Sequence, residues 1–166
     1  MAIHRLNHAV LYVHDVERSV AFYRDVLGFR VIQDMAGLPG AAFLRAPGST
    51  NDHDLGLFET GGNPAPRGST GLYHLAWEVD TLQDLDDLAA KLTAAGALVG
   101  ASDHSTTKSL YGQDPDGIEF EIAWIVPAAE LDDAARAGRA QIRPLNLERE
   151  KARYGASTAG GVGISR

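Results

Sequence analysis

The sequence has no cysteine among its 166 residues. That absence excludes disulfide scaffolds, thiolate metal sites and cysteine nucleophiles together. Apolar runs approaching the roughly 20 residues that cross a bilayer are also missing. The opening residues, MAIHRLNHAVLYV, show no cationic segment followed by a hydrophobic one. We therefore expect no secretory signal, no membrane partner and a cytoplasmic location.

Positive charge is scarce as well, with 15 Lys and Arg against 22 Asp and Glu and a formal net charge of −7. Nucleic-acid binding needs a clustered basic surface. The one stretch that mixes several basic residues, 136–153, is interrupted by Glu148 and Glu150. We therefore expect no nucleic-acid partner. The length is enough for one domain, or for two small modules that share a core.

The first half of the chain predicts a strand, a helix and three further strands. Leu6 to Val13 is β-rich and mostly apolar, which indicates a buried strand. Asp15 can cap a helix over residues 16–27, and Gly28 stands where a C-terminal cap belongs. The three shorter strand candidates cover residues 29–34, 41–46 and 54–59. Residues 61–71, GGNPAPRGSTG, then have the composition of a linker.

The same order of elements begins again after this linker. Residues 72–79, LYHLAWEV, predict a strand with histidine at its third position, as in LNHAVLYV. A helix over 81–95 ends at Gly96. Strand candidates follow at 97–100, 108–113 and 118–125. The order βαβββ thus occurs twice and places His8 and His74 at the same point of two units, 66 residues apart.

Two units of this kind cannot each close a core alone. We therefore expect an α+β fold in which two paired βαβββ modules form an open sheet barrel around a metal cleft. The modules are expected at residues 1–66 and 67–127. Residues 128–166 are expected to form a C-terminal helical and extended tail, docked but with a frayed glycine-rich end.

Three side chains are candidate metal ligands. A lone histidine in an apolar strand is more often a core or surface residue than a ligand, but a pseudo-twofold repeat would direct His8 and His74 to one cleft. In IEFEI, alternation places Glu119 and Glu121 on one face of an interior strand, where unpaired carboxylates are costly. Two histidines and a carboxylate form the facial arrangement that holds non-haem Fe(II) with open positions. Without thiolates, Fe(II) or Mn(II) fits better than structural zinc.

The two βαβββ units, with His8, His74 and Glu121 in register, resemble the vicinal oxygen chelate superfamily. That superfamily includes glyoxalase I, fosfomycin-resistance proteins, methylmalonyl-CoA epimerase and the type I extradiol catechol dioxygenases. The resemblance covers about residues 5–126, and the helix that ends in VAFYRDVLGF is a marker of it. It implies that the three residues are the metal ligands.

Residues 102–121, SDHSTTKSLYGQDPDGIEFE, are similar to the signature of the extradiol dioxygenases. That signature has a histidine, five to seven residues, an apolar residue and tyrosine, two residues, Asp-Pro-x-Gly, and a glutamate. This chain supplies His104, Tyr111 and Glu121 at those places, and Ser102 is the position that departs from the pattern. His53, in NDHDLGLFE, matches the acid–base histidine of the same enzymes.

The resemblance implies ring cleavage of a small aromatic diol by O₂ at Fe(II), with Mn(II) possible. His53 would move a proton, Tyr111 would hydrogen-bond the substrate oxygen, and His104 would support that oxygen from further out. We also expect a homo-oligomer, at least a dimer.

Other members of the superfamily remain alternatives. Glyoxalase I has a fourth ligand, a glutamate on the last strand of the first module, where residues 54–57 read Asp-Leu-Gly-Leu. Fosfomycin-resistance enzymes carry a threonine two residues after the first histidine, where this chain has Val10. A metal-free small-molecule binding protein would usually lack the triad. A glyoxalase-like isomerase or lyase, a fosfomycin-type transferase and a binding protein are therefore the competing hypotheses.

Overall fold

The computed structural model describes residues 2, 3, 5–33, 37–66 and 68–161. It has a mixed α+β fold with two sheets, and each sheet belongs to one of two compact units. The first unit comprises residues 1–69 together with the turn at 114–117, and the second comprises 70–113 and 118 onward. The α+β class is therefore confirmed. The enclosure of a metal cleft by an open barrel, and the module boundaries at 66 and 127, stay predictions.

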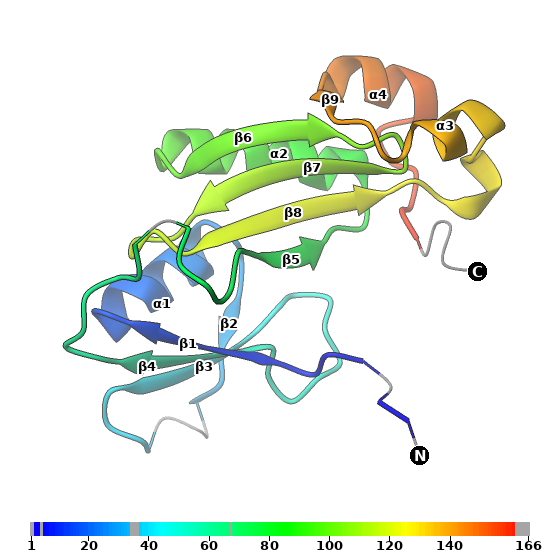
Figure 1. Ribbon diagram of the computed structural model, residues 1–166. Helices are drawn as coiled ribbons and strands as arrows, with labels where there is room; N and C mark the ends of the chain where they lie inside the picture. Colours follow the sequence, from blue (N-terminus) through cyan, green and yellow to red (C-terminus); the bar gives the residue numbers. More distant parts are fainter. Residues whose placement is uncertain (1, 4, 34–36, 67, 162–166) are drawn as a thin grey trace. The chain divides into compact units, whose positions relative to one another are not determined.

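The first unit has the predicted βαβββ order (Figure 1). Its elements are β1 (Ala9–Val13), α1 (Val16–Asp25), β2 (Arg30–Val31), β3 (Ala41–Arg45) and β4 (Leu55–Glu59). The sheet runs β1-β4-β3-β2, in which β1 is parallel to β4 and the other pairs are antiparallel. The last strand of the unit therefore lies in the middle of its sheet, beside the first.

Local sequence explains where α1 begins and where the chain turns after it. The Asp15 side chain accepts a hydrogen bond from the backbone N–H of Arg18 at 2.9 Å, as a capping residue does. The helix ends at Asp25, two residues before the predicted end, and Gly28 turns the chain with a φ of 79°. The N-cap at Asp15 is confirmed, whereas the C-cap is Val26 and Gly28 takes the positive-φ position two residues later.

The Asp-Pro-Asp-Gly turn belongs to the first unit, although it joins two strands of the second. The Tyr23 hydroxyl, buried on α1, donates to Asp114 of this turn at 3.2 Å. Arg18 of α1 forms an ion pair with Asp116. Burial, followed by the charge of Asp114, raises the pKa of Tyr23 well above its ordinary value. The turn is thus held by α1 as well as by its own backbone.

The second unit repeats the topology of the first. Its elements are β5 (Leu75–Glu78), α2 (Leu82–Ala94), β6 (Leu98–Asp103), β7 (Thr107–Gln113) and β8 (Glu119–Ile125). The sheet runs β5-β8-β7-β6-β9, again with the first strand parallel to the last strand of the repeat. A capping box between Thr81 and Asp84 starts α2. Leucines along one side of this helix are buried.

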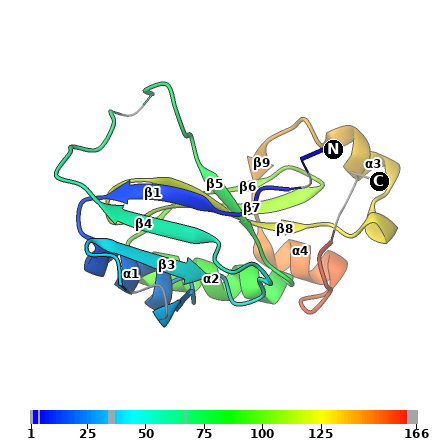
Figure 2. The same cartoon turned by 90° about the horizontal axis from the view of Figure 1, so that it is seen from below.

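The C-terminal tail is part of the second unit. It contains a short 3₁₀ turn (Ala128–Glu130), α3 (Asp133–Gly138), β9 (Arg143–Pro144) and α4 (Leu147–Tyr154). The helices α4 and α2 pack against each other, as Figure 2 shows from below. The helical tail agrees with the sequence, whereas β9 was not predicted because its two residues form a strand only by pairing with β6. The predicted frayed end includes residues 162–166, which lie outside the described residues.

The first strand differs from its prediction. We expected a buried strand over Leu6 to Val13, but β1 begins at Ala9 and only one of its faces is buried. Val13 is 1% exposed, whereas Tyr12 is 76% exposed. Alternation along the strand explains the difference, because successive side chains point to opposite faces.

The second unit contains a buried cluster of charged side chains that come from β6, β7 and α4. The Lys108 Nζ lies 2.5 Å from Asp103 Oδ1 and 3.1 Å from Glu150 Oε2, and each of the three residues is at most 4% exposed. Arg149 adds ion pairs to both carboxylates. Burial by itself would raise the pKa of Asp103, but the hydrogen bonds from Lys108 and from the Ser105 backbone, with the charge of Lys108, lower it. These pairs fasten α4 to β6 and β7.

Across the described part of the chain, no helix has the length and apolarity that a membrane span requires.

Candidate functional site

The sheet of the second unit brings His74, Tyr111 and Glu121 together by register. Tyr111 on β7 lies directly opposite Glu121 on β8, and Ala76 on β5 lies opposite Glu121 on the other side. His74 stands just before β5, and its Nε2 lies 3.2 Å from Glu121 Oε2. Phe120 on β8 is buried, while Glu121 is only partly buried, so the predicted alternation along this strand is confirmed.

Glu121 is fixed by contacts at both of its oxygens. Oε1 accepts a hydrogen bond from the Ser109 hydroxyl, and Oε2 faces the His74 imidazole. The other ring nitrogen of His74, Nδ1, is buried and has no hydrogen-bond partner among the residues the structure describes. The contact between Nε2 and Glu121 therefore orients the imidazole ring of His74.

Tyr111 and His104 form a hydrogen-bonded pair beside this carboxylate. His104 Nε2 lies 2.9 Å from the Tyr111 hydroxyl. His104 reaches Tyr111 from the tight turn between β6 and β7, in which Ser105 has a φ of 65° and the His104 N–H donates to the Thr107 carbonyl. Burial, followed by the negative charge of Glu121, raises the pKa of Tyr111. Tyr111 is therefore a neutral phenol at neutral pH, able to donate a proton in a hydrogen bond.

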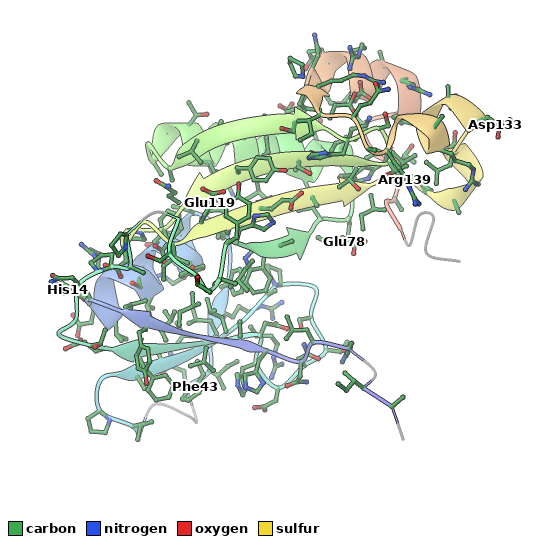
Figure 3. The ribbon with its side chains drawn as sticks, viewed as in Figure 1. His14, Phe43, Glu78, Glu119, Asp133 and Arg139 are labelled. Carbon is green, nitrogen blue, oxygen red and sulfur yellow. The ribbon has the colours of Figure 1, made fainter. Side chains whose placement is uncertain are left out.

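A pocket of about 450 Å³ opens beside this pair. Its lining consists of His104, Thr106, Thr107, Tyr111, Glu121, Arg139 and Ala140. Figure 3 shows Arg139 at the end of α3, next to the ends of β7 and β8. Sequence reasoning did not identify Arg139, because no local pattern signals that a tail residue will dock beside a strand far away in the sequence.

The first unit brings His8 and His53 together in the same way. Because β1 and β4 pair in parallel with Ala9 opposite Leu55, the residues just before the two strands become neighbours. The rings of His8 and His53 have centroids 4.5 Å apart. His53 Nδ1 lies 3.0 Å from Asp52 Oδ2, and the Phe43 ring meets the His53 ring edge-on. His8 is exposed, whereas the His53 side chain is 14% exposed.

A buried carboxylate holds the loop that carries His53. Asp54 accepts hydrogen bonds from the Ala46 backbone N–H at 2.8 Å and from the Ser49 hydroxyl at 2.8 Å. It also accepts one from the Asn51 amide at 2.7 Å. With these three bonds satisfied, Asp54 is a structural residue, and it fixes the position of the preceding histidine.

The six predicted site residues thus fall into two groups. His74, Glu121, Tyr111 and His104 meet in the second unit, and His8 and His53 meet in the first. Counting only described residues, neither unit alone gathers three His, Asp or Glu side chains into a group that could hold a metal ion. The ligand set of His8, His74 and Glu121 and the catalytic roles stay predictions.

The donors of the second unit fit the metal that the sequence predicts. A neutral imidazole nitrogen and a carboxylate oxygen 3.2 Å apart can serve as adjacent ligands of one cation. The chain offers no thiolate, so imidazole and carboxylate are the donors available. This donor set suits Fe(II) or Mn(II).

Comparison with known proteins identifies the family. Residues 5–122 match the model of the glyoxalase/bleomycin resistance protein/dioxygenase superfamily, and the chain belongs to that superfamily. Among solved structures, a glyoxalase/dioxygenase from Nostoc punctiforme has a TM-score of 0.60 and 25% sequence identity. That match covers 72% of this chain and 89% of the other.

Several similar proteins carry dioxygenase names. Catechol-2,3-dioxygenase of Bacillus subtilis is 31% identical over 70% of this chain and 40% of its own length. An iron-dependent extradiol dioxygenase of Rhodococcus jostii is 34% identical over 70% of this chain and 41% of its own length. A manganese-dependent 2,3-dihydroxybiphenyl 1,2-dioxygenase of Geobacillus genomosp. 3 is 31% identical over 81% of this chain and 41% of its own length. The chain therefore spans about two fifths of the length of these relatives.

Proposed function

We propose that this chain is an extradiol ring-cleaving dioxygenase that acts with O₂ on a catechol-type aromatic diol. The observation that carries the proposal is a pocket lined by Glu121, Tyr111 and His104, beside which two pairs form. Glu121 Oε2 lies 3.2 Å from His74 Nε2, and the Tyr111 hydroxyl lies 2.9 Å from His104 Nε2. The first pair offers metal ligands, and the second offers a proton donor and its partner. The dioxygenase names of similar proteins support the same reading.

The proposed metal site takes His8 from the first unit and His74 with Glu121 from the second. When bound there, a divalent metal would lower the pKa of a coordinated hydroxyl and leave positions open for diol and O₂. Both an iron-dependent and a manganese-dependent dioxygenase are similar to the chain, so we propose Fe(II) with Mn(II) as the other candidate.

The remaining roles belong to groups that hold or move protons. The neutral Tyr111 phenol is proposed to donate a hydrogen bond to a substrate oxygen, while His104 Nε2 supports the phenol from the other side. His53 is proposed to carry a proton, since an imidazole nitrogen can both accept and donate one and Asp52 Oδ2 lies 3.0 Å from His53 Nδ1. Asp54 would keep His53 in place through the loop it organises.

Anaerobic loading with Fe(II) or Mn(II), followed by O₂ uptake with a panel of catechols, tests the proposal. We expect diol-dependent O₂ uptake and a yellow ring-opened product. If no catechol supports uptake in metal-loaded protein, the dioxygenase proposal fails. The same preparation is then assayed for isomerisation of the methylglyoxal–glutathione adduct and for thiol addition to fosfomycin, which test the two enzyme alternatives.

We also propose that the protein is a homo-oligomer, at least a dimer. Light scattering coupled to size-exclusion chromatography gives the mass directly, and a mass of one 17.7 kDa chain would contradict the proposal.

A further inference from the structure

The pocket contains a positive charge that the proposed ring-cleavage chemistry does not use. Arg139 lines the pocket together with Tyr111 and Glu121. Within the part of the chain that the structure describes, the pocket lining has no other arginine and no lysine, and no carboxylate pairs with Arg139. Glu121 is already engaged by His74 and Ser109. The guanidinium is therefore available to a ligand.

The fold places Arg139 there through a specific contact. Gly138, the last residue of α3, packs so closely on the turn between β6 and β7 that a Cβ on it would lie 2.5 Å from the Ser105 hydroxyl. Arg143 donates to the same hydroxyl at 3.1 Å. Asp132 caps α3 and pairs with Arg153 of α4 at 2.9 Å. The tail is thus fastened on both sides of Arg139.

Arg139 and the proposed diol site lie toward different ends of one strand. Thr107 and Tyr111, both in the pocket lining, are four residues apart on β7. With a rise of about 3.3 Å per residue, their Cα atoms are about 13 Å apart. Figure 3 shows Arg139 near the beginning of β7 and the end of β8, and Glu119 at the opposite end of β8. A ligand that reaches both Tyr111 and Arg139 therefore carries a substituent away from its diol.

We infer that Arg139 selects a catechol whose ring bears a short side chain ending in a carboxylate. This inference rests on the proposed ring-cleavage function and names its substrate class. A guanidinium presents two parallel N–H donors that match a carboxylate. Thr106 and Thr107, whose hydroxyl groups can also donate, line the same pocket. Since the chain carries a net charge of −7, an anionic substrate needs such a local cation to offset the general repulsion.

The test compares an acid with its neutral counterpart. Dihydroxyphenylpropionate and its methyl ester, each as the 2,3- and the 3,4-dihydroxy isomer, are assayed for O₂ uptake with Fe(II)-loaded protein. Binding of the same compounds to metal-loaded protein without O₂ is measured by calorimetry. Wild type is compared with Arg139→Gln, Arg139→Lys and Arg136→Gln. Arg136 is the matched control, because it is an exposed arginine on the same helix that does not line the pocket.

For Arg139→Gln we expect KM and Kd of the acid to rise about 30-fold, the size of one lost charge-assisted contact. The KM and Kd of the ester, and the kcat of both compounds, should stay near their wild-type values. Arg139→Lys should recover part of the loss, because it restores the charge without the bidentate geometry. Arg136→Gln should change nothing. Raising the salt from about 0.05 to about 0.5 M should narrow the difference between acid and ester, because the arginine is exposed.

The outcomes separate the two proposals. If wild type cleaves the esters as well as the acids, ring cleavage stands and the role of Arg139 is overturned. If no diol is cleaved but the acid still binds more tightly than the ester through Arg139, the anion subsite stands and the dioxygenase proposal fails. If no diol is cleaved and acid and ester bind alike, both are overturned.

Discussion

The two units share one topology but carry different side chains at equivalent positions. In the first, β3 and β4 place Phe43 opposite Gly56, and in the second, β7 and β8 place Tyr111 opposite Glu121. The parallel pairs give the same correspondence, since Val10 lies opposite Gly56 and Ala76 opposite Glu121. A histidine precedes the first strand in both. The first unit thus has His, Phe and Gly where the second has His, Tyr and Glu.

The difference shows how one fold can carry different side chains at equivalent positions. Gly56 leaves its position to the side chains of Phe43 and Val10, which a Cβ would approach at 3.5 and 3.4 Å. The first unit therefore has apolar side chains around this position, with His8 and His53 just before its strands, while the second has a carboxylate and a phenol there. By register Gly56 corresponds to Glu121, so the first unit has no carboxylate at that position.

The largest effect should follow from making the second unit resemble the first at this position. Glu121→Ala removes a ligand from a proposed three-ligand site, so metal affinity should fall by more than about 100-fold and turnover should be lost. Metal content after gel filtration measures the first effect. Glu119→Ala is the matched control, because Glu119 lies on the same strand two residues earlier (Figure 3). Normal iron content in Glu121→Ala would refute the ligand assignment.

The second unit also contains a buried cluster of ion pairs that connects its sheet to α4. Lys108→Ala leaves Asp103 and Glu150 without their buried cation, so the free energy of unfolding should drop by about 3–5 kcal/mol. Urea denaturation followed by circular dichroism measures it. Lys91→Ala, an exposed lysine in the last turn of α2, should change stability little. A Lys108 variant as stable as the Lys91 variant would show that the cluster does not anchor α4.

His53 tests whether the first unit takes part in the chemistry. His53→Phe should keep iron and catechol binding while slowing turnover by about 100-fold, the scale of general acid–base catalysis. His14→Gln is a suitable control, since His14 is exposed and lies in the turn between β1 and α1 (Figure 3). Steady-state kinetics and calorimetric binding separate the two effects. Unchanged turnover in His53→Phe would eliminate its proton-transfer role.

Tyr111→Phe gives the second unit the aromatic residue that the first already has at Phe43. The ring is retained but the hydroxyl that meets His104 is lost, so kcat should fall by about 10-fold with little change in stability. Tyr12→Phe, at a side chain that is 76% exposed, is the comparison variant. If kcat is the same in both variants, Tyr111 is only a packed aromatic residue.

The smallest effect concerns pH and the buried charge cluster of the second unit. The pKa of Asp103 is lowered in the folded protein, so its ionised form stabilises the fold above its unfolded pKa of about 3.9. Asp103→Asn should cost about 1–2 kcal/mol at pH 7. That difference should shrink as the pH falls through the lowered pKa. A constant difference from pH 7 to pH 2 in urea titrations would contradict this assignment.

Local patterns in the sequence account for the repeat and for much of the site. Two βαβββ units, the caps of α1 and α2, and the common position of His8 and His74 follow from periodicity and turn residues that act over a few positions. The side of the sheet to which Glu121 points follows from the alternation of side chains along one strand. These features are encoded within segments, and short segments suffice to predict them.

The tertiary structure decided the rest. The sequence does not reveal that Ser109 fixes Glu121, that Lys108 is buried between two carboxylates, or that Arg139 reaches the pocket. The first depends on the register of two paired strands, and the other two depend on a C-terminal tail that docks on the sheet. The two-residue strand β9 likewise exists only by pairing with β6. Long-range packing selects these contacts from many that the same residues could make. Local propensity therefore predicts the elements, but not which distant side chains meet.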